Sequence, residues 1–356
     1  MKLVNGGRIR VLGTTFCCVA VLAGATAARS RADASRDREP TPLLWRDPGN
    51  VAEKNVYWGS GNSQRAPQPP FRFVKEDTGG TKPKVHVVDE RGEAWNVKFD
   101  HDSSTGREVP AEIAAGRIMW ALGYLVEESY LVSDGVIEQI GPLKRAREVI
   151  GPDGRFATAR FERRPTDVER LSKQWSLDDN PFARSPELSG LVVVVALLNN
   201  WDFRPGNTVV LRVNADTGPE DWYVVSDLGT AFGRMSGGIF RSPSRWNLKH
   251  YERDTAFIAC ADEAILELHY RPDGRGRARV PVAHARWLSR LTTQLTASQI
   301  QQAFRAAGAS DDEVRGFSAR LMAKLAELHD SVGNGRLPRL QPGPARRRCP
   351  SEQPPT

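Results

Sequence analysis

The sequence predicts an α+β fold with two lobes, a small antiparallel β lobe with one helix followed by a larger, mainly helical lobe. Three alternating segments between Phe71 and Phe99 are typical of strands, and a helical pattern follows them. Beyond Arg279, helical periodicity and two capping boxes dominate. With 356 residues, 40% of them hydrophobic and 26% charged, the chain can bury a sizeable core and has the composition of a globular protein.

The positive charge of the chain is dispersed rather than focused. The formal net charge is +7, but the basic residues are scattered through the chain, with one cluster at 346–348. Nucleic-acid binding requires a focused positive surface, so we expect no nucleic-acid partner. The basic net charge suits an anionic small ligand just as well as it suits nucleic acid. The six histidines show no metal-ligand spacing.

The N-terminus has the pattern of an export signal. A basic start precedes an apolar stretch at 11–25, and the small residues "ATA" at 25–27 are typical of a cleavage site. The apolar stretch is short for a permanent span. We therefore expect an exported protein, periplasmic or extracellular, with no stable membrane span after signal cleavage. An uncleaved N-terminal membrane anchor remains the alternative.

Changes in composition and periodicity divide the chain into five segments. We expect a signal peptide in 1–27, an N-terminal extension in 28–69, an N-terminal lobe in 70–140, a C-terminal lobe in 141–336 and a disordered Pro/Arg-rich tail in 337–356. Cleavage of the signal would leave Cys260 and Cys349, hence at most one disulfide, and their pairing is left open.

The expected N-terminal lobe begins with a three-stranded meander. "FRFVKED" and "KVHVVDE" alternate on either side of the turn "TGGTKPK", and "AWNVKF" closes the meander after "RGE". A helix with Pro110 in its first turn ends at Gly123, and "YLVEESYLV" predicts one or two further strands. "GPDG" at 151–154 is typical of a hairpin turn.

The expected C-terminal lobe opens with a buried helix. It starts near Ser185, with Pro186 in its first turn, although its β-branched run also permits a strand. "NTVVLRVNADTGPEDWYVVSD" predicts two short strands around a turn. Two later helices open with capping boxes, "TASQ" at 296–299 and "SDDE" at 310–313.

Polar residues gather directly after the buried helix, in "NNWDFRPGN" at 199–207. Asp202 and Asn207 lie on this loop, and the following hairpin would return Asp227 close to Asn207. Oxygen ligands arranged in this way suit Mg²⁺, with phosphate oxygens completing its shell. Asp202 would then be free to orient a hydroxyl nucleophile and accept its proton.

These motifs resemble those of the protein-kinase superfamily. "WDFRPGN" is similar to the kinase catalytic loop, and "DLG" at 227–229 is similar to the D-F-G metal motif. The resemblance implies that Asp202 is the catalytic Asp, that Asn207 and Asp227 hold Mg²⁺, and that Arg204 neutralises charge on the transferred phosphoryl group.

The expected N-terminal lobe supplies the other parts of this pattern. Lys98 stands on the third strand, and the next helix offers Glu108 or Glu112 as its partner, of which we favour Glu112. The turn with Gly79 and Gly80 lies where the kinase glycine-rich loop covers the phosphates of ATP.

Three departures separate the chain from ordinary eukaryotic protein kinases. "NW" replaces His-Arg before the catalytic Asp, the glycine turn lacks the full G-x-G-x-x-G motif, and no A-P-E element follows. The chain is thus similar to the HipA-type, phosphatidylinositol-kinase-like and secretory-pathway kinases. This resemblance implies a phosphotransferase that uses ATP and Mg²⁺ on a hydroxyl of a protein, lipid or sugar. A secreted pseudokinase that binds nucleotide or acts as a scaffold is the alternative, and a metal-dependent hydrolase is a third.

Overall fold

The computed structural model describes residues 39–80, 82–100, 106–235, 242–253, 257–271, 276–333 and Cys349. The expected signal peptide lies outside these residues, as does the expected tail apart from Cys349. Within the described part of the chain, none of the helices has the length and apolar content needed to cross a bilayer.

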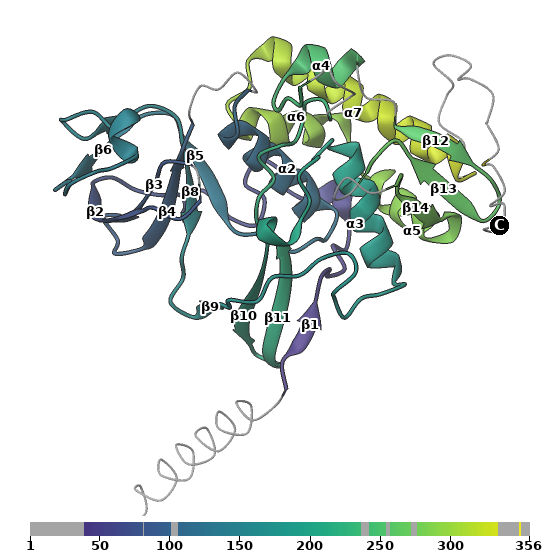
Figure 1. The fold of residues 1–356 in the computed structure, drawn as a ribbon, viewed down its shortest axis with the longest axis horizontal. Helices are drawn as coiled ribbons and strands as arrows, with labels where there is room; N and C mark the ends of the chain where they lie inside the picture. The colour runs from purple at the N-terminus through teal and green to yellow at the C-terminus, as the bar shows by residue number, and fades with distance from the viewer. Residues whose placement is uncertain are drawn as a thin grey trace, which may run out of the picture.

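A mixed seven-stranded sheet forms one end of the molecule (Figure 1). Its spatial order is β5-β8-β4-β3-β2-β6-β7. The strands are β2 (Phe71–Asp77), β3 (Lys84–Val88), β4 (Ala94–Phe99), β5 (Ser129–Val132), β6 (Gly135–Glu138), β7 (Arg155–Phe156) and β8 (Ala159–Arg163). The predicted antiparallel meander is confirmed in β2, β3 and β4. Because β8 pairs with both β4 and β5, the lobe boundary expected after residue 140 falls inside this sheet.

Helix α2 (Val109–Ala121) lies between this sheet and the helical part of the chain (Figure 1). Pro110 occupies its first turn as predicted, and Gly123, with φ of 93°, follows its end. Alanine and isoleucine side chains of α2 belong to the core of the helical part, whereas the sheet has a separate core around Trp95 and Phe161. The helix is therefore anchored in one lobe and reaches the strands of the other.

The helical part contains five helices among the described residues. They are α3 (Pro186–Leu197), α4 (Leu248–Arg253), α5 (Val282–Thr292), α6 (Ala297–Ala306) and α7 (Asp311–Ser331). The apolar run expected to be either helix or strand is helix α3, capped by Ser185, whose Oγ accepts from the backbone N–H of Leu188 at 3.1 Å. Both predicted capping boxes are present. The α+β class and its two-lobed arrangement are thus confirmed.

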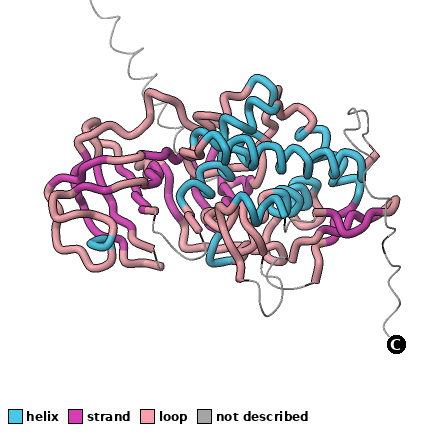
Figure 2. The backbone as a smooth tube through the Cα atoms, turned by 90° about the horizontal axis from the view of Figure 1, so that it is seen from above, coloured by secondary structure: helices cyan, strands magenta, loops and turns pink. Residues whose placement is uncertain are grey.

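Two smaller sheets complete the fold. One has the order β1-β11-β10-β9, and the other, β12-β13-β14, lies at the far end from the large sheet (Figure 2). Their strands are β1 (Thr41–Leu43), β9 (Val168–Arg170), β10 (Thr208–Ala215), β11 (Gly218–Val225), β12 (Ile258–Ala261), β13 (Ile265–Leu268) and β14 (Arg279–Pro281). Single 3₁₀ turns occur at Val51–Glu53, Ala146–Glu148 and Pro205–Asn207. Cys260 forms a disulfide with Cys349, which answers the question of their pairing.

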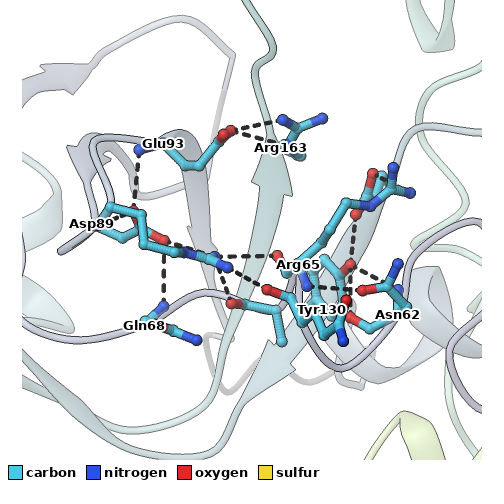
Figure 3. Close-up of polar contacts among 11 residues, drawn as sticks. Asn62, Arg65, Gln68, Asp89, Glu93, Tyr130 and Arg163 are labelled. Carbon is cyan, nitrogen blue, oxygen red and sulfur yellow. Dashed lines mark hydrogen bonds and ion pairs between the residues drawn. The ribbon is translucent and has the colours of Figure 1, made fainter.

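The N-terminal extension contacts both lobes. Its strand β1 pairs in parallel with β11, and Gln299 of α6 donates to the carbonyl oxygens of Val51 and Lys54 at 2.7 and 2.9 Å. Further along, Tyr130 of β5 contacts Asn62, while Asp89 accepts from the backbone N–H of Gln68 at 3.3 Å (Figure 3).

Candidate active site

The polar loop after α3 is held from several sides. The Asn200 carbonyl accepts from the Tyr270 hydroxyl at 2.9 Å, and Trp201 Nε1 donates to the Ser244 carbonyl at 3.1 Å. Asn199, with φ of 55°, turns the chain out of the helix. A buried lysine on α7, Lys324, donates to Asn199 Oδ1 at 2.8 Å. The loop is therefore fixed by the core beneath it, which is how functional loops are usually positioned.

Asp202 lies at the centre of this loop. Asn207 Nδ2 donates to its Oδ2 at 2.9 Å and to its carbonyl at 2.6 Å, while Arg204 Nε lies 3.0 Å from its Oδ1. The backbone N–H of Asp202 donates to Thr230 Oγ1 at 3.3 Å, so the loop is tied to the segment that follows the DLG motif. The Asp202 side chain is 28% exposed, which leaves it accessible to an acceptor.

The hairpin of β10 and β11 brings Asp227 to Asn207. Thr208 is opposite Val225 in the register, and the backbone N–H of Asp227 donates to the Asn207 carbonyl at 3.3 Å. Gly229 in turn donates its N–H to Asp227 Oδ1 at 3.0 Å. The three residues expected to form the catalytic loop and metal site therefore lie together, with Asn207 linking Asp202 to Asp227.

Lys98 of β4 meets two carboxylates of the helix region. Its Nζ lies 2.5 Å from Glu112 Oε1 and 2.9 Å from Glu108 Oε2. Glu112 Oε2 also lies 2.8 Å from a guanidinium nitrogen of Arg160 on β8. All four side chains are at least nine-tenths buried. The choice between Glu108 and Glu112 has no single answer, because Lys98 contacts both.

The four buried side chains around Lys98 lie against the DLG motif. A Cβ added to Gly229 would stand 3.0 Å from Glu112 Oε1 and 3.1 Å from Asp227 Oδ1, so glycine allows the carboxylates to approach. Burial raises the pKa of Glu112, although Arg160 and Lys98 oppose this effect. Burial alone would also raise the pKa of Asp227, but the charge of Lys98 and the Gly229 N–H outweigh it, and the net shift is downward. Asp227 is thus kept ionised, as a metal ligand requires.

The glycine turn reaches the site through a residue that the sequence did not single out. Gly79 and Gly80 are exposed, and a Cβ on Gly80 would meet nothing within 4 Å. Lys82 of the same turn, however, places its Nζ 3.0 Å from Glu108 Oε1. Arg245, from beyond the DLG segment, contacts the same oxygen. Sequence reasoning missed both: Lys82 stood within the "TGGTKPK" turn, whereas Arg245 lies in no recognisable motif.

The donor set fits Mg²⁺ and the phosphates of a nucleotide. The side-chain amide of Asn207 makes both of its hydrogen bonds described above through Nδ2, so its Oδ1 is the atom left for a cation. Asp227 supplies a carboxylate nearby. Within the described ranges, no group of three or more His, Cys, Asp or Glu side chains is arranged to hold a metal by itself. Mg²⁺ commonly uses one or two protein ligands together with substrate phosphates, so this small set is sufficient.

Comparison with known proteins finds similarity at the level of structure alone. No family model matches the chain, and no curated protein matches it in sequence. The chain is similar to the Helicobacter pylori proinflammatory kinase CtkA, with 14% identity and a TM-score of 0.42 over 74% of this chain and 95% of that one. It is also similar to the Golgi casein kinase with Mn/ADP bound, with 10% identity and a TM-score of 0.39 over 90% of this chain and 93% of that one. A second Golgi casein kinase structure gives 12% identity and a TM-score of 0.33 over 92% and 95% of the two chains. The solved structures named here are thus all kinases, and the function proposed below rests on the geometry of the site itself.

Proposed function

We propose that this protein is an atypical kinase-like phosphotransferase that uses ATP and Mg²⁺ to phosphorylate a hydroxyl group. The observation that carries the proposal is the meeting of Lys98, from the seven-stranded sheet, with Glu112 of α2 and with Asp227 of the helical lobe. Local sequence patterns do not require this meeting. A buried lysine between carboxylates, next to an ionised aspartate and a catalytic-type loop, is the arrangement that positions a nucleotide's phosphates for transfer.

Each residue has a distinct task in this mechanism. Lys98, held by Glu112, would bind phosphate oxygens, while Oδ1 of Asn207 and the carboxylate of Asp227 would hold Mg²⁺. When bound, the cation neutralises charge on the phosphates. Asp202 orients the acceptor hydroxyl and accepts its proton, and Arg204, paired with Asp202 and mostly exposed, neutralises charge at the transferred group. The glycine turn at Gly79 and Gly80 covers the phosphates.

We also propose that the protein works after export, in the periplasm or outside the cell. The signal-like N-terminus supports this location, and so does the Cys260–Cys349 disulfide, because such bonds persist mainly in oxidising compartments. The acceptor is a protein, lipid or sugar that carries a free hydroxyl. An exported location also favours the pseudokinase alternative, since ATP is scarce outside the cytoplasm.

Transfer of labelled γ-phosphate to protein, lipid and sugar fractions tests the activity. Transfer should be lost in Asp202→Ala, and we expect a loss of roughly 100-fold or more because general-base catalysis contributes about 10² to 10⁴. The matched control is Asp216→Ala, which changes an exposed aspartate in the turn between β10 and β11 and should leave transfer unchanged.

Three outcomes would contradict the proposal in different ways. Transfer that survives unchanged in Asp202→Ala would mean that another group is the base. Binding of ATP with Mg²⁺ but no transfer to any fraction would favour the pseudokinase. Phosphate release in the absence of an acceptor would favour a hydrolase.

A further inference from the structure

Three cations, one of which is Lys98, converge on the carboxylate of Glu108. Glu108 Oε1 is contacted by Lys82, at 3.0 Å, and by Arg245, while Glu108 Oε2 lies 2.9 Å from Lys98. The three cations come from the glycine turn, strand β4 and the segment after the DLG motif. The three cations outnumber the one carboxylate that they share, although Lys98 also pairs with Glu112.

Glu108 does not have the usual role of a residue at its position. It stands at the N-cap of α2, where side chains normally accept from backbone N–H groups, yet it makes no such capping bond. Its side chain is only 10% exposed and its oxygens are directed to the cations. The carboxylate therefore acts as the anion of this cluster rather than as a helix cap.

The backbone at Arg245 is contacted from two sides. Ser244, its neighbour, exchanges two backbone hydrogen bonds with Arg234, at 2.9 and 3.1 Å. On the other side, Gly106 approaches so closely that an added Cβ would stand 2.0 Å from the Arg245 carbonyl. Among the described residues, the buried Nε of Arg245 has no hydrogen-bond partner, so the guanidinium keeps an unused donor at this site.

We propose that Lys82 and Arg245 bind the polyphosphate of the nucleotide, and that Glu108 stands in for the phosphates in the ligand-free protein. The inference rests on the proposed function, since it extends the phosphate site from Lys98 to two further cations. A polyphosphate offers more acceptor oxygens and more negative charge than one carboxylate. It satisfies all three cations at once and releases Glu108.

Calorimetric titration of the full chain with ATP, adenosine and inorganic tripolyphosphate, each with Mg²⁺, tests this assignment. Lys82→Met and Arg245→Met should each weaken ATP and tripolyphosphate binding by about tenfold, the effect of losing a charge-assisted hydrogen bond, and leave adenosine binding unchanged. Glu108→Gln should tighten the binding of both phosphate ligands, because the competing anion is removed. Lys84→Met is the matched control: Lys84 lies close to the same turn but pairs with Asp77 at 3.0 Å, and its loss should change nothing.

The contrary results separate this inference from the function on which it rests. If the wild type binds ATP but Lys82→Met and Arg245→Met bind it equally well, the cluster is only a structural link between the lobes. If Glu108→Gln weakens ATP binding, Glu108 is itself a ligand of the nucleotide or its metal, and the stand-in role is wrong. If the wild type binds none of the three probes while folded, the proposed function falls together with this inference.

Discussion

Replacement of the buried Lys324 on α7 should destabilise the protein through the polar loop at 199–207. Its side chain is fully buried, and its Nζ donates to the Leu197 carbonyl at 3.0 Å and to Asn199 Oδ1 at 2.8 Å. Methionine has a similar length and would keep the packing against Tyr251 and Phe257, whose rings lie 4.6 and 5.7 Å from the ammonium. Lys324→Met therefore removes mainly the polar contacts.

The expected loss follows from these contacts. Two hydrogen bonds contribute about 1 to 1.5 kcal/mol each, and the buried Asn199 oxygen loses the partner described here, so the free energy of unfolding should fall by about 2 to 4 kcal/mol. Urea denaturation measures this change. Arg315→Met is the matched control on the same helix: its ion pair with Asp312 is exposed, so we expect a loss below about 1 kcal/mol.

The pH dependence gives this prediction a second readout. Burial lowers the pKa of Lys324 well below its usual 10.5, so in the range between the two values the unfolded chain holds more protons than the folded one. Between these two pKa values, the free energy of unfolding of the wild type therefore rises with pH because of Lys324. Lys324→Met lacks this contribution. The gap between the two proteins should widen as pH rises toward 10.5. A loss no larger than that of Arg315→Met, or a gap that narrows with rising pH, would refute this reasoning.

Three further substitutions test other parts of the structure. Lys98→Met removes the cation that the buried carboxylates of Glu112 and Glu108 share, but Glu112 keeps Arg160 and Glu108 keeps its two other cations. It should abolish phosphate transfer and lower the free energy of unfolding by about 1 to 3 kcal/mol in urea titrations; unchanged transfer would exclude Lys98 from the phosphate site. Cys260→Ser should lower stability by about 2 to 4 kcal/mol, and a reductant should lower wild-type stability equally but leave the variant unaffected. Gly229→Ala places a methyl group 3.0 Å from Glu112 Oε1 and 3.1 Å from Asp227 Oδ1 and should push these carboxylates apart, so calorimetry should show weaker ATP binding. Binding with wild-type affinity would mean that Glu112 and Asp227 need not lie close together.

Local patterns were sufficient to predict most individual elements. The meander from Phe71 to Phe99, helix α3 and both capping boxes are confirmed because alternation, apolar periodicity and cap residues act over a few neighbouring positions. The proximity of Asp227 to Asn207 was also predictable, because a short hairpin determines it.

Long-range pairing was beyond the reach of the same reasoning. Strand β8 inserts between β4 and β5, and the three-residue β1 pairs with β11 nearly 180 positions away in the sequence. Likewise, no local signal indicates that Arg245 contacts Glu108 or that Lys324, on a predicted helix, contacts Asn199. Such contacts depend on how complete lobes pack together, which a single sequence does not reveal.

The most direct test of the central claim, that this site binds a nucleotide with its metal, is the thermal and urea stability of the protein with and without ATP and Mg²⁺. A ligand that binds only the folded state, present at about a hundred times its Kd, should raise the free energy of unfolding by about 2.7 kcal/mol. We predict this increase for the wild type and its loss in Asp227→Ala, which lacks the proposed metal ligand. A folded wild-type protein whose stability does not respond to ATP and Mg²⁺ would contradict the account.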